Sequence, residues 1–141
     1  MKIAALDLGN VWTGVALSDP LGITVRPYET IPSILLNNRL EQIITKEELS
    51  VIVVGDPQTL RGTISAQTIQ VRGQVENLQR VFPLIRWVLW DERLTSKQAA
   101  IIKPARDKKN KEQQHAIAAA LILRSYLDHL IWQQEHKNNN E

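Results

Sequence analysis

The chain has 141 residues, of which 17 are Lys or Arg and 15 are Asp or Glu, so its formal charge is +2. That length suits one domain, and 43% apolar residues can form its core, which excludes extensive disorder. The absence of cysteine excludes disulfides, thiolate zinc sites and thiol nucleophiles. No apolar run approaches the roughly 20 residues that span a bilayer, and no signal peptide is recognisable. We therefore expect a cytoplasmic protein without a membrane partner.

The first half of the chain predicts a three-stranded meander, then a helix and another strand. Apolar alternation and turn residues predict strands over 2–7, 13–18 and 23–30, each antiparallel to the one before. A helix is expected to open at Pro32-Ser33, because the apolar positions that follow fall on one face. A short buried strand is expected over 50–54.

The second half alternates helices and strands. The spacing predicts a helix over 65–81, a strand over 85–90, a short helix over 95–102, a mobile basic loop over 103–111 and a last helix over about 114–133. We expect residues 1–135 to form a single domain and residues 136–141 to be a polar tail without structure.

This order of elements predicts an α/β fold with a central first strand and with later strands parallel to it. Ligands of such sheets bind at the carboxyl ends of the strands. Three strands carry acids at that place: Asp7, Asp56 and the pair Asp91-Glu92. Asp7 is the best candidate for a functional role, because an acid that ends an apolar central strand loses solvation unless a cation or a donor meets it.

Four segments resemble one family. Its motifs match Asp7-Leu8-Gly9-Asn10-Val11-Trp12-Thr13-Gly14, Val53-Val54-Gly55-Asp56-Pro57, Asp91-Glu92-Arg93-Leu94-Thr95-Ser96 and the apolar run 118–123. In these motifs and their order the chain resembles the YqgF/RuvX family of ribonuclease-H-like proteins, to which Holliday junction resolution and nuclease action on pre-16S ribosomal RNA are ascribed. The resemblance implies a five-stranded mixed sheet of order 3-2-1-4-5, flanked by helices.

The resemblance also implies a nuclease site that holds a divalent cation, Mg²⁺ or Mn²⁺, by carboxylates. Such hydrolysis needs hard oxygen ligands that hold the cation against the scissile phosphate. Asp7 and Glu92 match two carboxylates of the family, whereas Asp91 is expected to point to the other face of its strand.

The third family acid is replaced here. Its position, at the start of the last helix, is occupied by His115, which could ligate a metal, transfer a proton or be purely structural. Asp56 stands where the family usually has leucine, and it could supply the missing ligand by facing Asp7, or simply form the turn before Pro57. Both alternatives are open at the level of sequence.

Clustered basic residues predict contacts with the phosphates of nucleic acid, since affinity follows local rather than net charge. The candidates near the acids and in the basic segment are Arg93, Lys97, Lys103, Arg106, Lys108, Lys109 and Lys111.

The leading hypothesis is a metal-dependent endonuclease of structured nucleic acid that acts in ribosome biogenesis at the 5′ end of pre-16S ribosomal RNA. One alternative is a Holliday junction resolvase that acts on DNA four-way junctions. Another is a catalytically weak nucleic-acid-binding module, suggested by the loss of the third acid at His115. We expect a monomer or a weak homodimer.

Overall fold

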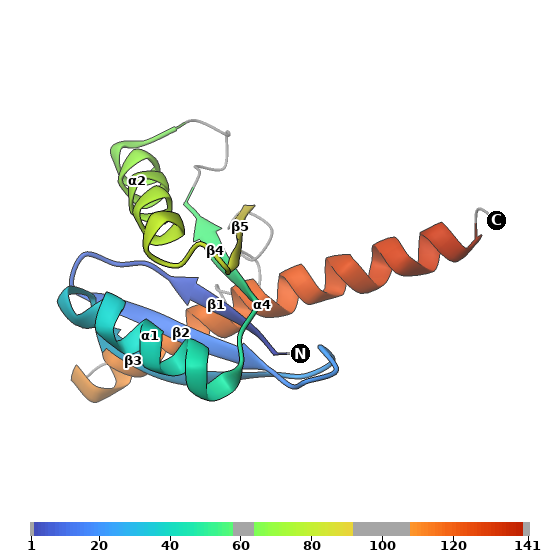
Figure 1. The fold of residues 1–141 in the computed structure, drawn as a ribbon, viewed down its shortest axis with the longest axis horizontal. Coiled ribbons are helices and arrows are strands. Elements are labelled where there is room, and N and C mark those ends of the chain that lie inside the picture. Colours follow the sequence, from blue (N-terminus) through green and yellow to red (C-terminus); the bar gives the residue numbers. More distant parts are fainter. Residues whose placement is uncertain (1, 58–63, 92–107, 140–141) are drawn as a thin grey trace.

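A computed structural model describes residues 2–57, 64–91 and 108–139 (Figure 1). The elements in chain order are β1 (Ile3–Asp7), β2 (Trp12–Ser18), β3 (Val25–Pro32), a short 3-10 helix (Ser33–Leu35), α1 (Leu36–Glu47), β4 (Val51–Asp56), α2 (Ala66–Val81), β5 (Arg86–Asp91) and α4 (Lys108–Asn139). This order agrees with the expected one. The helix expected over 95–102 lies outside the described residues.

The five strands form one sheet of order β3-β2-β1-β4-β5, which confirms the expected ribonuclease-H-like topology. β1 pairs antiparallel with β2 and parallel with β4, and β5 pairs parallel with β4. The carboxyl ends of β1, β4 and β5 therefore share one edge of the sheet, as the sequence predicted for the acids that end them.

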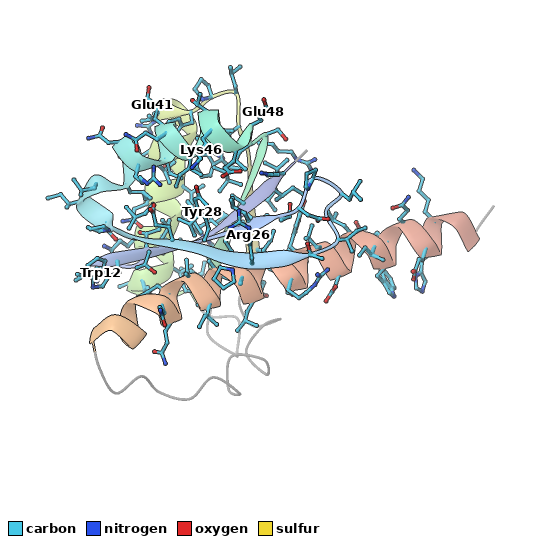
Figure 2. The ribbon with its side chains drawn as sticks, turned by 90° about the horizontal axis from the view of Figure 1, so that it is seen from below. Trp12, Arg26, Tyr28, Glu41, Lys46 and Glu48 are labelled. Carbon is cyan, nitrogen blue, oxygen red and sulfur yellow. The ribbon has the colours of Figure 1, made fainter. Side chains whose placement is uncertain are left out.

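Helices cover both faces of the sheet, and alternate strand residues pack against each layer. Leu6 and Val54 belong to the hydrophobic core on the α1 and α2 side. Ala5 and Val53 belong to a second core cluster against α4. Figure 2 shows α1 and α4 on opposite sides of the sheet.

The start of α2 is fixed by a capping box. The Ser65 hydroxyl accepts the backbone N–H of Thr68, while the Thr68 side chain accepts the backbone N–H of Ser65. The buried Thr68 hydroxyl also donates to the carbonyl of Pro57, at 2.8 Å. These bonds tie the first turn of α2 to the chain that leaves β4.

A glycine lets α4 lie directly on β2. A Cβ atom added to Gly14 would overlap the carbonyl oxygen of His115 and the backbone nitrogen of Ala116. Small side chains elsewhere in this layer, such as those of Ala16 and Ala119, are completely buried. The close approach places His115 beside the end of β1, because Gly14 is the register partner of Asp7.

α4 is longer than the sequence predicted. It begins at Lys108 rather than near 114, so residues 108–111 of the expected basic loop are helical. It also continues to Asn139, so residues 136–139 of the expected unstructured tail are helical too. Both extensions lack Gly and Pro, and the first is rich in good helix formers such as Lys, Gln and Glu. Residues 136–139 are His, Lys and two Asn, so the helix continues through them with little propensity of their own. Residues 131–137 are all exposed, and Figure 1 shows this end of α4 projecting past the sheet.

No helix in the described parts of the chain is both long enough and apolar enough to span a membrane.

Candidate functional site

Asp7 ends β1 at the carboxyl edge of the sheet. Its side chain follows the alternation of Ala5 and so lies on the α4 face, with 25% of its surface exposed. The chain then turns tightly through Gly9, where an added Cβ would overlap the carbonyl oxygen of Trp12. The Gly9 and Gly14 of the first motif therefore serve the same end: one turns the chain after Asp7, and the other admits α4 beside it.

His115 is the side chain that the structure brings to Asp7. Its Nδ1 lies 3.7 Å from Asp7 Oδ2, and 34% of the histidine side chain is exposed. The interaction with the Asp7 carboxylate raises the pKa of His115 above its ordinary value of 6.5, although partial burial opposes the shift. His115 was expected at the helix start, but it lies well inside α4, which begins at Lys108.

Asp56 does not face Asp7, and this expectation is wrong. Leu6 pairs with Val54 in the sheet, so Asp56 follows the alternation of Val54 onto the α2 face, whereas Asp7 lies on the α4 face. The Asp56 carboxylate accepts two bonds from Arg72 of α2, at 3.2 and 2.9 Å from its Nε and Nη2. With 5% of Asp56 exposed, this ion pair compensates a buried charge.

Sequence reasoning missed Arg72, although a signal was present. Arg72 follows buried Thr68 by four residues on the helix that packs over β4. An acid in place of leucine at the end of a buried strand requires a nearby cation, and this helix offers one.

The Asp91 side chain points away from the sheet face that carries Asp7, as expected. It is the register partner of Asp56, so its side chain lies on the α2 side of the sheet.

The other expected site residues lie at the margins of the structure or beyond them. Lys108, Lys109 and Lys111 fall in the first residues of α4. Glu92, Arg93, Lys97, Lys103 and Arg106 lie outside the described residues.

Asp7 and His115 together offer donors of the kind that divalent cations use, a carboxylate oxygen and an imidazole nitrogen, and both side chains are partly accessible. Among residues 2–57, 64–91 and 113–137, no group of three or more His, Cys, Asp or Glu side chains is arranged to hold a metal ion. The pair therefore fits part of a cation site.

The fold is ribonuclease-H-like. It resembles Thermus thermophilus RuvC in complex with a Holliday junction substrate, with a TM-score of 0.58 and 14% identity, over 92% of this chain and 96% of that one. A second RuvC structure from Thermus thermophilus gives a TM-score of 0.57 at 13% identity, with the same coverage.

The family follows from sequence comparison. The model of the family "RuvX: Holliday junction resolvase" matches residues 1–129, so this chain belongs to the RuvX family of nucleases, as the motifs indicated. A relative from Rubrobacter xylanophilus is 39% identical over 128 residues, which are 90% of this chain and 92% of the relative. A relative from Sulfurihydrogenibium sp. is 36% identical over 97% of both chains. Both relatives are named "Putative pre-16S rRNA nuclease".

Proposed function

We propose that this chain is a metal-dependent endonuclease that hydrolyses phosphodiester bonds in structured nucleic acid and trims the 5′ end of pre-16S ribosomal RNA in the cytoplasm. The observation that carries the proposal is the Asp7 carboxylate at the end of the central strand, with His115 of α4 3.7 Å away. The names of the relatives support the choice of an RNA substrate.

Asp7, His115 and Glu92 are the residues we propose to hold Mg²⁺ or Mn²⁺. A bound divalent cation supplies Lewis-acid stabilisation of the phosphate and an activated water. Asp7 contributes a hard oxygen, and Glu92 adds a second carboxylate directly after Asp91, whose side chain lies on the opposite face to that of Asp7. Asp56 has no part in this set, because it is engaged by Arg72.

His115 can act in either of two ways. Neutral imidazole can coordinate a cation, while protonated imidazole can hold a proton beside Asp7 when no cation is bound. Its raised pKa favours the protonated form in the metal-free protein.

The substrate backbone is proposed to contact the basic residues that precede and open α4. Phosphate contacts by Arg93, Lys97, Lys103, Arg106, Lys108, Lys109 and Lys111 would give affinity without specifying sequence.

Two alternatives rest on specific observations. The RuvC-like fold and the family description favour cleavage of a DNA four-way junction. A histidine beside Asp7, where the family resemblance implies a third acid, favours a binding module with weak catalysis.

Incubation of the purified protein with precursor 16S ribosomal RNA and with a synthetic four-way DNA junction tests the proposal, in Mg²⁺, in Mn²⁺ and in EDTA. We expect cation-dependent cleavage of the RNA precursor near its 5′ end and none in EDTA. Cleavage confined to the junction supports the resolvase alternative. Binding without cleavage in either cation supports the binding module.

A further inference from the structure

A cavity of about 400 Å³ adjoins the candidate nuclease site on the α2 side. The loop that follows Asp7, including Gly9 and Asn10, forms one wall, and α2 forms the other. Gly9 also lies beside His115, because a Cβ added to it would be 3.9 Å from His115 Cε1. The same loop thus contacts both the cavity and the pair of side chains proposed to act in cleavage.

Uncharged amides dominate the polar lining of the cavity. Gln67, Gln70 and Gln74 recur at helical spacing on one face of α2. The Gln70 side chain donates to the Asn10 side-chain carbonyl at 2.9 Å, which fixes the loop against the helix. Within the described residues, no hydrogen bond occupies the side-chain amide of Gln67 or Gln74. Each amide therefore offers both a donor and an acceptor to a ligand.

The described lining of the cavity offers no charged side chain to a phosphate. In the first turn of α2 the Ser65 hydroxyl already accepts the Thr68 N–H, so this group is not open to an anion. A ligand with uncharged donors and acceptors fits better, and buried Leu8 and Val71 add apolar wall for a flat ring.

We propose that this cavity receives one unpaired nucleobase of the substrate, whose edge is read by the amides of Gln67 and Gln74. Asn and Gln side chains match base edges because they pair a donor with an acceptor, and unpaired bases are the usual target of sequence-specific RNA recognition. The inference rests on the proposed function, because the base would belong to the strand that passes Asp7. It assigns to α2 a role in selecting where the strand is cut.

The test measures binding in EDTA, so that cleavage does not intervene. The probe is a labelled RNA hairpin with a single-stranded tail, in which one tail base at a time is replaced by an abasic nucleotide, and a DNA hairpin of the same sequence distinguishes the two sugars. The variant Gln67→Met/Gln74→Met keeps side-chain length but removes both amides, and each single substitution is measured as well. Gln79→Met, on the exposed side of the same helix, is the matched control.

In the parent and in Gln79→Met, we expect one abasic position to weaken binding by about 5- to 150-fold, the range of a good base-edge contact. In the double variant the same replacement should cost at least about fivefold less than in the parent, because only the contact of the ring with the apolar wall remains. The dependence of affinity on salt should stay as in the parent. A parent that binds every abasic probe equally, or that binds none of the probes, overturns the proposal, and so does a double variant that keeps the abasic penalty.

The outcome is separable from that of the proposed function. Base discrimination without cleavage in Mg²⁺ or Mn²⁺ would contradict the nuclease proposal and leave the base site standing. Cleavage without base discrimination would contradict the base site and leave the nuclease proposal standing.

Discussion

Asp7 and His115 form a pair because of two neighbouring residues that carry no side chain. Gly9 turns the chain after Asp7. Gly14, the register partner of Asp7, lets the backbone of α4 reach the sheet. The imidazole then meets a carboxylate that would otherwise be partly desolvated without a partner. Compared with a site that has a third carboxylate, this site has one fewer negative charge, and it offers an imidazole nitrogen in place of a carboxylate oxygen. This difference should change which cation the site prefers.

That preference can be tested at His115. His115→Asp should raise Mg²⁺-supported cleavage relative to Mn²⁺-supported cleavage, because it restores a hard oxygen ligand. His115→Ala should lower cleavage with both cations. The measurement is the ratio of single-turnover rates in the two cations. If neither substitution changes that ratio or the rates, His115 has only a structural role.

The places of Asp7, His115 and Asp56 differ in how far the sequence predicted them. The motif placed Asp7 at a strand end, and the structure has it there. The interpretation of His115 as the residue that stands in place of the family acid stays a prediction: the structure brings it to Asp7, but from within α4 rather than from the start of that helix. The expected pairing of Asp56 with Asp7 failed because a strand alternates its side chains: adjacent strand ends share an edge, but an offset of one residue sends the side chain to the other face. The register of β4 against β1, to within one residue, is set by packing and cannot be read from a single sequence.

At the scale of elements, the contact between α4 and β2 depends on Gly14. Gly14→Ala should lower the free energy of unfolding by about 3 kcal/mol or more, since the added methyl group meets backbone that cannot move without displacing the helix. Gly73→Ala is the matched control: nothing lies within 4 Å of its added Cβ, and alanine should stabilise the interior of α2 by about 0.5–1 kcal/mol. Chemical denaturation measures both. Equal effects of the two substitutions would contradict the close approach of α4.

An ion pair between Lys2, directly before β1, and Glu47 of α1 should give stability a dependence on pH. Lys2 Nζ lies 2.6 Å from Glu47 Oε2, and this bond lowers the pKa of Glu47 below its ordinary value of 4.5. A lowered pKa in the folded state means that the stabilisation is present above about pH 4.5 and is lost as the pH falls through the folded-state pKa.

Glu47→Gln should therefore lower the free energy of unfolding by up to about 1 kcal/mol at neutral pH, with the difference from the parent disappearing in acid as the pH falls below the folded-state pKa of Glu47. Glu41→Gln, at an exposed position of the same helix (Figure 2), should leave stability unchanged at both values. Thermal denaturation at a series of pH values checks this. A constant difference between Glu47→Gln and the parent from neutral to acidic pH would show that the ion pair contributes nothing.

Most elements were predictable because their apolar periodicity is strong. The strands alternate or are continuously apolar, and α2 repeats Thr68, Val71, Val75 and Leu78 at helical spacing. The length of α4 was not predictable in this way, because its ends are polar on all sides and carry no periodic signal. The 3-10 turn at Ser33–Leu35, which delays the start of α1, likewise has no signal of its own.

At the scale of the whole molecule, a net charge of +2 must be unevenly spread if the protein is to hold nucleic acid. Replacing Lys108, Lys109 and Lys111 together by Gln should weaken binding to RNA of every sequence about equally and flatten the dependence of affinity on salt, since phosphate contacts release counterions. Gln keeps the helical propensity of α4. Titrations at several salt concentrations measure the slope, and an unchanged slope would remove these lysines from the interface.

If cleavage is organised around Asp7, the rate of cleavage by Asp7→Asn is the decisive measurement. The substitution removes the charge of a proposed cation ligand and little volume, so the variant should stay folded and lose more than about 100-fold in rate with either cation. Glu92→Gln should behave in the same way. Asp128→Asn, which changes an exposed acid that pairs with Arg124 on α4, should keep the parent rate. Cleavage by folded Asp7→Asn at the parent rate, from a preparation free of other nucleases, would show that Asp7 is not part of the cleavage site.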